Sequence, residues 1–220
     1  MTNMELKCTI CRVQVCREEP GTKPVPAFCP AVTGLEVLDD ARQIYQSDTE
    51  AQNLACSAAQ VEAAGYCRWP RVQEVMEFAR RLKVSHLGIA TCVGLIHEAS
   101  LLQEILEAND FQVSSVCCKV GSIPKEEIGL QEDEKIHPGQ FEALCNPIGQ
   151  AALLNKAGTG LNIVVGLCVG HDSLFFKHSE APVTVLVAKD RVTGHNPAAA
   201  LYTSHSYYQR LRAEGAKRQK

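Results

Sequence analysis

Short apolar runs alternate with helical stretches over most of the chain, and this order predicts an α/β fold. Four runs have the length and apolar content of buried strands, at residues 84–91, 111–117, 161–168 and 181–189. Helical stretches follow them at residues 94–110, 146–158, 172–177 and 195–211. Strands that alternate with helices form parallel sheets with right-handed crossovers. We therefore expect a mostly parallel sheet of about four strands flanked by helices, a Rossmann-like three-layer arrangement.

Further helical segments precede the first strand. Over residues 35–64, apolar side chains recur at the three-to-four spacing of a helix with one buried face: Leu35, Leu38, Ala41, Ile44 and Tyr45. Gly65 should end this helical part, and Pro70 stands near the start of the next helix. At the other end of the chain, Asn196 as N-cap and Pro197 at the first helical position predict a closing helix.

Composition divides the chain into a small N-terminal module and a larger α/β domain. Residues 1–33 hold four cysteines and four prolines but few large aliphatic side chains, so they cannot build a hydrophobic core of their own. Residues 34–220 comprise a helical lead-in (34–83), a βαβ core (84–190) and a C-terminal helix with a basic tail (191–220). We expect the first module to need a bound metal ion to fold.

Charge and hydropathy narrow the function classes. The 220 residues carry a formal net charge of -3, with a sequence pI near 6.2, which argues against a nucleic-acid-binding surface. No apolar run reaches the roughly 18 residues of a membrane helix, and the first residues lack the features of a signal peptide. The sequence does not determine the protein's oligomeric state. We expect a cytoplasmic protein whose thiols stay reduced. Its eleven cysteines therefore need an explanation other than disulfides.

The N-terminal cysteines have the spacing of a metal site. They follow the pattern Cys-x2-Cys-x4-Cys-x12-Cys: Cys8, Cys11, Cys16 and Cys29. A Cys-x2-Cys pair lets two thiolates reach one ion from a tight turn, and two more complete a tetrahedron. The ion is zinc or the iron of a cluster, since both accept four thiolates. Cys67 is a further ligand or an alternative to Cys16 or Cys29. Four unrelated thiols in a weakly structured arm are the competing interpretation.

A second cysteine set stands at the predicted strand ends or just before a helix: Cys92, Cys117, Cys118, Cys145 and Cys168. The carboxyl ends of parallel strands meet at one edge of a sheet, and ligands bind there. Side chains alternate along a strand, so one of Cys117 and Cys118 must point away from the other. Free cysteine is also common in buried strands. Several cysteines converging on one edge nevertheless predict a site that holds a metal ion or cluster.

The same edge fits a thiol catalyst without metal. Cys92 or Cys168 would then be the nucleophile, because a neighbouring helix N-terminus lowers the pKa of a thiol. His171 follows Cys168 at Cys-x2-His spacing and would serve as general base or as a nitrogen ligand. Asp172 and Asp190 are candidates to orient His171.

Two other features fall near this edge. A basic segment follows the fourth strand and would bind an anionic substrate or form ion pairs at a helix start: Lys189, Asp190, Arg191 and His195. A polar connection of 26 residues separates Cys118 from Cys145. Structureless connections of this length are uncommon in compact domains unless they cover a site. The connection is therefore either a lid over the edge site or a surface loop, and we give these two interpretations equal weight.

Several long motifs resemble one known family. They are the segments GYCRWPRV, GIATCVGLIHEA, VCCKVGSIPKEEIG, NPIGQAALLN and GLCVGHDSLFFKHSEAPVTVLVAKDRVTGHNPAAALY, with the N-terminal CTIC. Together they span nearly the whole chain and resemble the prokaryotic family catalogued as domain of unknown function 1847. Members of that family are often described as predicted metal-binding proteins. The resemblance implies metal binding and no particular reaction.

Three functions are compatible with these patterns. The first is an iron-sulfur or other thiolate-metal protein with redox or sulfur-transfer chemistry on a small-molecule substrate. The second is a non-catalytic zinc-binding carrier, sensor or interaction protein. The third is a metal-free enzyme with a cysteine nucleophile. Anaerobic purification separates the first from the others, because a cluster gives a brown colour.

Overall fold

A computed structural model of the chain describes residues 6–212. The chain divides into two compact units, Met1–Ala64 and Gly65–Lys220, so residues 34–64 of the expected helical lead-in belong to the first unit. Part of the expected basic tail lies outside the described residues: Lys217, Arg218 and Lys220. The second unit carries the sheet.

The first unit is helical after a stretch of turns. Its elements are η1 (Cys8–Ile10), η2 (Val15–Arg17), α1 (Pro30–Thr33), α2 (Leu35–Ser47) and α3 (Thr49–Gly65). Asp48 separates α2 from α3, because its Oδ1 accepts hydrogen bonds from the backbone amides of Glu50 and Ala51 at 2.9 and 3.1 Å. These bonds satisfy amides that have no partner within the first turn of α3.

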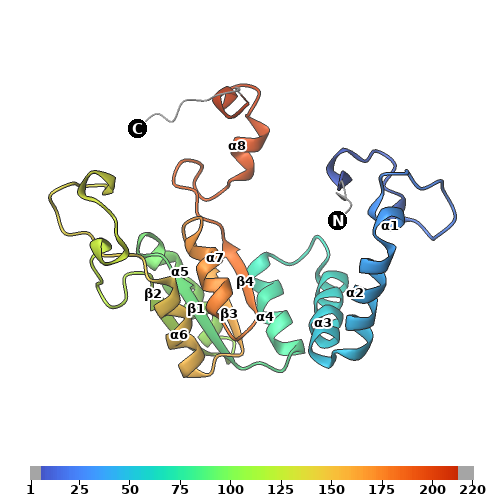
Figure 1. Cartoon of the computed structure of the whole chain (residues 1–220). Helices are drawn as coiled ribbons and strands as arrows, with labels where there is room; N and C mark the ends of the chain where they lie inside the picture. Colours follow the sequence, from blue (N-terminus) through green and yellow to red (C-terminus); the bar gives the residue numbers. More distant parts are fainter. Residues whose placement is uncertain (1–5, 213–220) are drawn as a thin grey trace. The chain divides into compact units, whose positions relative to one another are not determined.

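Four parallel strands form the sheet of the second unit, as the sequence predicts (Figure 1). They are β1 (His86–Thr91), β2 (Gln112–Cys117), β3 (Leu161–Val165) and β4 (Val183–Val187). Their order is β2-β1-β3-β4, and every neighbouring pair is parallel. The chain moves from β1 to β2 on one side and then crosses to β3 on the other side. This reversal is a topological switch point, where open α/β sheets bind ligands.

Helices cover both faces of this sheet. They are α4 (Arg71–Arg81), α5 (Ile96–Glu107), which follows η3 (Val93–Leu95), α6 (Pro147–Ala157) and α7 (His171–His178). The helices α6 and α7 pack against each other, and α5 and α6 both contact β1 and β2. A side chain at Gly88 would meet Leu154 of α6, whereas Thr91 lines a cavity with Ala99 of α5. Residues three apart on a strand face opposite sides, so α5 and α6 lie on opposite faces, and the α/β expectation is confirmed.

The hydrophobic core lies between the sheet and these helices. Its most deeply buried large side chains are at most 1% exposed and come from strands and helices alike: Leu87, Ile89, Leu106, Leu154, Leu161, Ile163 and Phe175. Each fully buried side chain of this size stabilises the fold by roughly 1.5–3 kcal/mol. The core holds the strand ends in fixed register, which in turn fixes the residues that follow them.

The closing helix is shorter than the sequence predicts. The helix α8 spans Ala198–Tyr202, its N-cap is Pro197 in place of Asn196, and η6 (Gln209–Leu211) follows after turns. Hydroxyl groups compete with the helical pattern here, since Thr203 Oγ1 and Ser204 Oγ donate to backbone carbonyl oxygens at 2.7 Å. Among residues 6–212, none of the helices is both long and apolar enough to span a bilayer.

Candidate functional site

The register of the sheet places Cys92 beside Cys118. Thr91, the last residue of β1, pairs with Cys117, the last residue of β2. The amide of Cys118 donates to Thr91 O at 2.8 Å, and the amide of Cys92 donates to Val165 O at 3.1 Å. The first residues beyond the two strands are therefore both cysteines, and both are buried, at 4% and 2% exposure. Strand pairing alone brings these two thiols together.

A closed loop returns the chain to the same place and delivers Cys145. The amide of Asn146 donates to Cys118 O at 2.7 Å, and Lys119 Nζ donates to Ala143 O at 2.5 Å. Asn146 also caps α6, because its Oδ1 accepts from the amide of Gly149 at 2.8 Å. The predicted opening of this helix by Asn146 and Pro147 is confirmed. Cys145 is thereby fixed directly ahead of the helix and next to Cys118.

Hydrogen bonds connect the three thiols. Cys118 lies between Cys92 and Cys145, and its Sγ is hydrogen-bonded to both. These bonds and burial raise the pKa of Cys118 well above its ordinary value. The Cys118 thiol, with Lys189 and the Gly94 amide, lowers the pKa of Cys92 to about 4 despite burial. Within this trio of thiols, Cys118 therefore favours its protonated form and Cys92 favours its thiolate form.

The pKa of Cys145 is lowered as well. It falls to about 5, chiefly through the Cys118 thiol and then through the charge and hydrogen bond of Lys119, against the effect of burial. His171 adds a smaller electrostatic contribution of the same sign. The lowered pKa values of Cys92 and Cys145 favour the thiolate form, which binds metal ions and attacks electrophiles.

Two basic side chains from the segment after β4 reach the same edge. Lys189 Nζ donates to Cys92 Sγ at 2.9 Å, and Arg191 Nη2 donates to Cys168 Sγ at 3.1 Å. Cys168 stands in the turn that follows β3, where Gly166 adopts a φ of +67° and leaves room for Leu95. The structure thus brings together four of the predicted edge cysteines, namely Cys92, Cys118, Cys145 and Cys168, with two cations.

Neither acidic neighbour orients His171. Asp172 Oδ1 accepts from the amide of Ser173 at 2.8 Å, at the start of α7. Asp190 Oδ1 accepts from the amides of Val192 and Thr193 at 2.9 and 3.0 Å, and these bonds lower its pKa. Both carboxylates stabilise local backbone. His171 begins α7, and its imidazole acts on Cys145 through its charge.

Cys117 belongs to the other face of the sheet. It lines a cavity of about 310 Å³ between β2 and α5, together with Thr91, Ser100 and Gln103. The alternation of side chains along β2 separates it from Cys118, as expected for adjacent strand residues. Cys118 thus belongs to the group of four edge cysteines, here called the thiol cluster, whereas Cys117 does not. A substitution of Cys117 is therefore a matched control for the same substitution of Cys118.

The N-terminal cysteines occupy turns and a helix start. Cys8 opens η1, Cys16 lies in η2 and Cys29 is the N-cap of α1, while Cys67 belongs to the second unit with a φ of +55°. Among residues 6–212, no three His, Cys, Asp or Glu side chains are arranged so that they could hold a metal ion. All eleven cysteines are free, so metal binding by either cysteine set stays a prediction.

Sequence reasoning missed two residues that support the cluster. Lys119 was not singled out, although its position directly after Cys118 was a signal. Gln150 of α6 is fully buried, and its Nε2 donates to Thr91 O at 3.1 Å and to Val116 O at 2.7 Å. It joins the ends of β1 and β2 just before Cys92 and Cys118. A glutamine within an apolar helical pattern gives no sequence signal of such a role.

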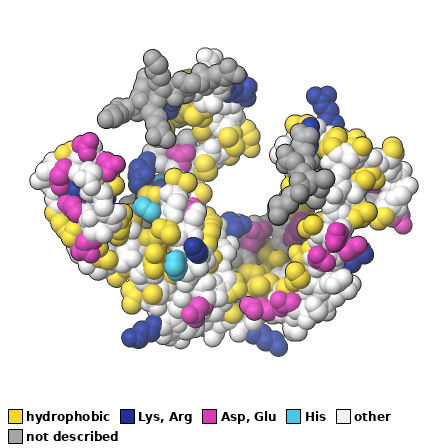
Figure 2. All heavy atoms as spheres, in the orientation of Figure 1, with side chains coloured by type: hydrophobic (Ala, Val, Ile, Leu, Met, Phe, Trp, Pro, Cys, Tyr) yellow, Lys and Arg dark blue, Asp and Glu magenta, His cyan; other side chains and the backbone are white. Residues whose placement is uncertain are grey.

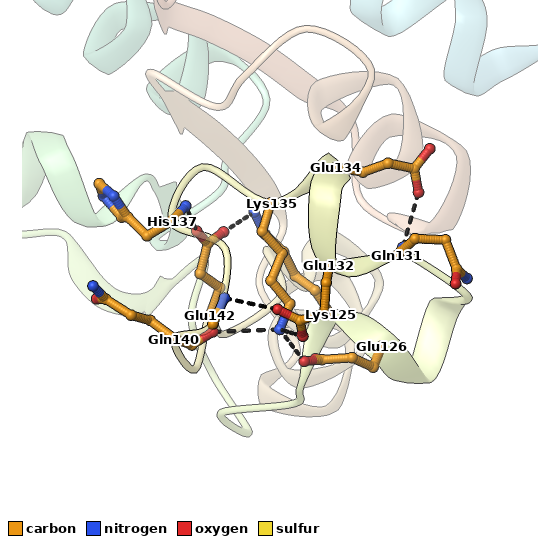
Figure 3. A network of polar contacts seen from close by, with 10 residues as sticks. Lys125, Glu126, Gln131, Glu132, Glu134, Lys135, His137, Gln140 and Glu142 are labelled. Carbon is orange, nitrogen blue, oxygen red and sulfur yellow. Dashed lines mark hydrogen bonds and ion pairs between the residues drawn. The ribbon is translucent and has the colours of Figure 1, made fainter.

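The loop between Cys118 and Cys145 is held by its own ion pairs (Figure 3). Lys135 forms ion pairs with Glu126 and Glu132 and is 2% exposed at its side chain, and Lys125 pairs with Glu142. These contacts lower the pKa of each of the three carboxyls and raise that of Lys135. Further acidic side chains gather over this loop (Figure 2). Its function as a lid stays a prediction.

The fold and the site define a three-layer α/β protein with a thiol cluster at the switch point of its sheet. The family described as "Protein of unknown function (DUF1847)" matches residues 29–186, and the chain belongs to this family, as the sequence motifs predict. The matched segment includes all five predicted edge cysteines and begins after Cys8, Cys11 and Cys16. The chain is also 41% identical over 213 residues to the uncharacterized protein MJ0455 of Methanocaldococcus jannaschii, over 96% of this chain and 100% of that protein. No solved structure matches the chain.

Proposed function

We propose that the thiol cluster binds one transition-metal ion, with zinc preferred, through Cys92, Cys118 and Cys145, and with Cys168 as fourth ligand. The observation that carries the proposal is the position of Cys118, which is hydrogen-bonded to two other thiols from separate segments. Two thiols that both contact Cys118, each with a lowered pKa, form with it a donor set that soft and borderline metal ions prefer. When bound, the ion acts as a Lewis acid.

Burial favours a metal ion over a substrate as the partner of these thiols. Cys92 is 4% exposed and Cys118 is 2% exposed. A nucleophile must meet the electrophilic atom of a substrate directly, which such exposure hinders. A bare ion is small enough to reach buried thiolates. The Lys189 contact and the low pKa of Cys92 keep the metal-free nucleophile as a second candidate.

Charge balance supports the same proposal. Four thiolates around a divalent ion leave two negative charges in a partly buried site. Lys189 and Arg191, which donate to Cys92 and Cys168, supply two positive charges. Burying a charge is costly unless it is paired and hydrogen-bonded. The basic segment after β4 thus suits a tetrathiolate centre.

The closeness of the thiols favours one ion over a cluster. Around zinc, with a Zn–S distance of about 2.3 Å, tetrahedral ligand sulfurs lie about 3.8 Å apart. Thiols in hydrogen-bond contact have a comparable separation. In a 4Fe–4S cluster, by contrast, each cysteine binds a different iron atom, so the cysteines stand further apart. Ion binding would replace the bonds among the thiols and require small side-chain rotations.

Metal analysis of the anaerobically purified full chain tests the proposal. Cys118→Ser should lose about one metal equivalent relative to the unaltered chain, and Cys117→Ser should lose none. The pair is well matched, because the residues are adjacent and only Cys118 touches the cluster. Equal metal content in the two variants, or a brown cluster-bearing protein, would overturn the assignment of one ion to these thiols.

The N-terminal cysteines constitute a separate proposal. Their spacing supports a structural zinc site in a module without a core, in a protein that works in the reducing cytoplasm. The double variant Cys8→Ser/Cys11→Ser should lose a second metal equivalent and keep the first. Cys56→Ser, an exposed cysteine on α3, is the control and should lose neither. Unchanged metal content in the double variant contradicts a second site.

A further inference from the structure

Cys168 differs from the other three cluster cysteines in its surroundings. Cys92, Cys118 and Cys145 are connected by hydrogen bonds between thiols, whereas the sulfur of Cys168 is held by Arg191 at 3.1 Å. Cys168 is also partly exposed, in a turn between Gly166 and Gly170, both of which have positive φ. The cluster therefore consists of a connected trio and a fourth thiol with its own cation.

One cation, Arg191, contacts Cys168, and its charge also reaches two thiols of the trio. The charge of Arg191 acts on Cys92 and Cys145 as well as on Cys168, and that of His171 acts on Cys145. The nearest carboxylates in the sequence, Asp172 and Asp190, are bound to backbone amides. An anion that replaced Cys168 would thus meet Arg191, whose planar fork of donors suits anionic groups.

We infer that Cys168 is an exchangeable ligand and that the ion takes a small anionic sulfur ligand, a low-molecular-weight thiolate or hydrosulfide, in its place. This inference rests on the proposed metal centre. Zinc sites that act on ligands keep three protein donors and one open position. An ion held by three thiolates favours a fourth soft donor, and Arg191 already donates a hydrogen bond to the sulfur of Cys168 in this position.

The exchange balances without any oxidant or reductant. The bond between the ion and Cys168 Sγ breaks, and a bond from the ion to the sulfur of the incoming thiol forms. The proton of that thiol passes to Cys168, which becomes a neutral thiol. Arg191 then turns its hydrogen bond from Cys168 to the new ligand. The charge of the centre is the same before and after the exchange.

Cobalt(II) binding tests the inference, because the absorbance of cobalt reports its thiolate ligands. The full chain carries Cys8→Ser/Cys11→Ser throughout, so that only the edge site is observed. Adding Cys168→Ser should leave one cobalt bound, and adding Cys118→Ser should abolish binding. In the Cys168→Ser chain, 2-mercaptoethanol should restore the absorbance of four thiolates. Arg191→Gln should weaken that response about tenfold, and Lys177→Gln, at the far end of α7, should not.

The outcomes separate this inference from the proposal beneath it. Without cobalt binding in the chain that keeps all edge cysteines, the metal centre itself is wrong. If that chain binds cobalt but Cys168→Ser abolishes binding, Cys168 is a permanent ligand and the inference fails alone. Retained cobalt with no spectral response to the thiol also overturns it, because the fourth position then takes water only.

Discussion

Lys189 Nζ lies 2.9 Å from Cys92 Sγ, although 97 positions separate the two residues in the sequence. The contact passes over the end of β3, because β3 stands between β1 and β4 in the sheet. Gly94 makes room for it, since a side chain at this position would approach Lys189 Nζ to 3.1 Å. A cation from the segment that follows the edge strand β4 thus reaches buried Cys92 at the end of the central strand β1.

Replacing this cation should change the titration of Cys92. In the metal-free chain, Lys189→Met should raise the pKa of Cys92 from about 4, because the variant removes one hydrogen bond and one positive charge. The rise should be partial, since Cys118 contributes more than Lys189. The measurement is the ultraviolet absorbance of thiolate against pH, with Lys177→Met as control. An unchanged titration would show that Lys189 does not stabilise the thiolate form of Cys92.

The stability of the metal-free chain should depend on pH in both directions. Cys92 and Cys145 have lowered pKa values, of about 4 and 5. Their contribution is complete above the unfolded value of about 8.5 and is lost as pH falls toward 5. The pKa of Cys118 is raised, so its contribution is complete below about 8.5 and is lost as pH rises. Stability should therefore be greatest near pH 8.5.

Urea unfolding at a series of pH values measures this dependence. Cys118→Ala should remove the loss on the alkaline side and reduce the loss on the acid side, because Cys118 is the main cause of the low pKa values of its neighbours. Cys117→Ala should leave the profile of the unaltered chain. A flat profile between pH 5 and 8.5 would show that the thiols do not interact as described.

The turn before Cys168 should tolerate little change. Gly166→Ala should lower the free energy of unfolding by roughly 3 kcal/mol or more, from backbone strain and overpacking together. Its φ is +67°, and an added Cβ would lie 2.7 Å from Leu95. Gly158→Ala is a matched control at a φ of +70° with no neighbour within 4 Å, so it should cost about 1 kcal/mol. Denaturant unfolding measures both losses. If the two variants lose the same free energy of unfolding, the contact with Leu95 does not contribute.

The sequence predicts the sheet well because its strands are short, apolar and separated by clear helical patterns. It also indicates that Cys92 and Cys168 lie at the carboxyl edge, since residues that follow a parallel strand must lie there. It does not decide between Cys117 and Cys118, because that choice depends on which face of β2 meets α5. The pairing of Thr91 with Cys117 settles it by placing Cys118 beside Cys92.

Local sequence patterns do not reveal which residues far apart in the chain contact each other. The contact of Lys189 with Cys92 follows from the position of β4 beside β3, which no local spacing specifies. The predicted length of the closing helix is wrong for a local reason. The hydroxyl groups of Thr203 and Ser204 donate to backbone carbonyl oxygens, and the pattern of apolar residues does not reveal these bonds. The buried role of Gln150 likewise depends on where α6 docks across the ends of β1 and β2.

X-ray absorption at the zinc edge tests the central claim most directly. The sample is the zinc-loaded full chain with Cys8→Ser/Cys11→Ser, so that the signal comes from the sheet edge. Three or four sulfur neighbours at about 2.3 Å, absent when Cys118→Ser is added, are the predicted result. A first shell of oxygen and nitrogen, or the same sulfur shell with and without Cys118, would contradict a metal centre built on Cys92, Cys118 and Cys145.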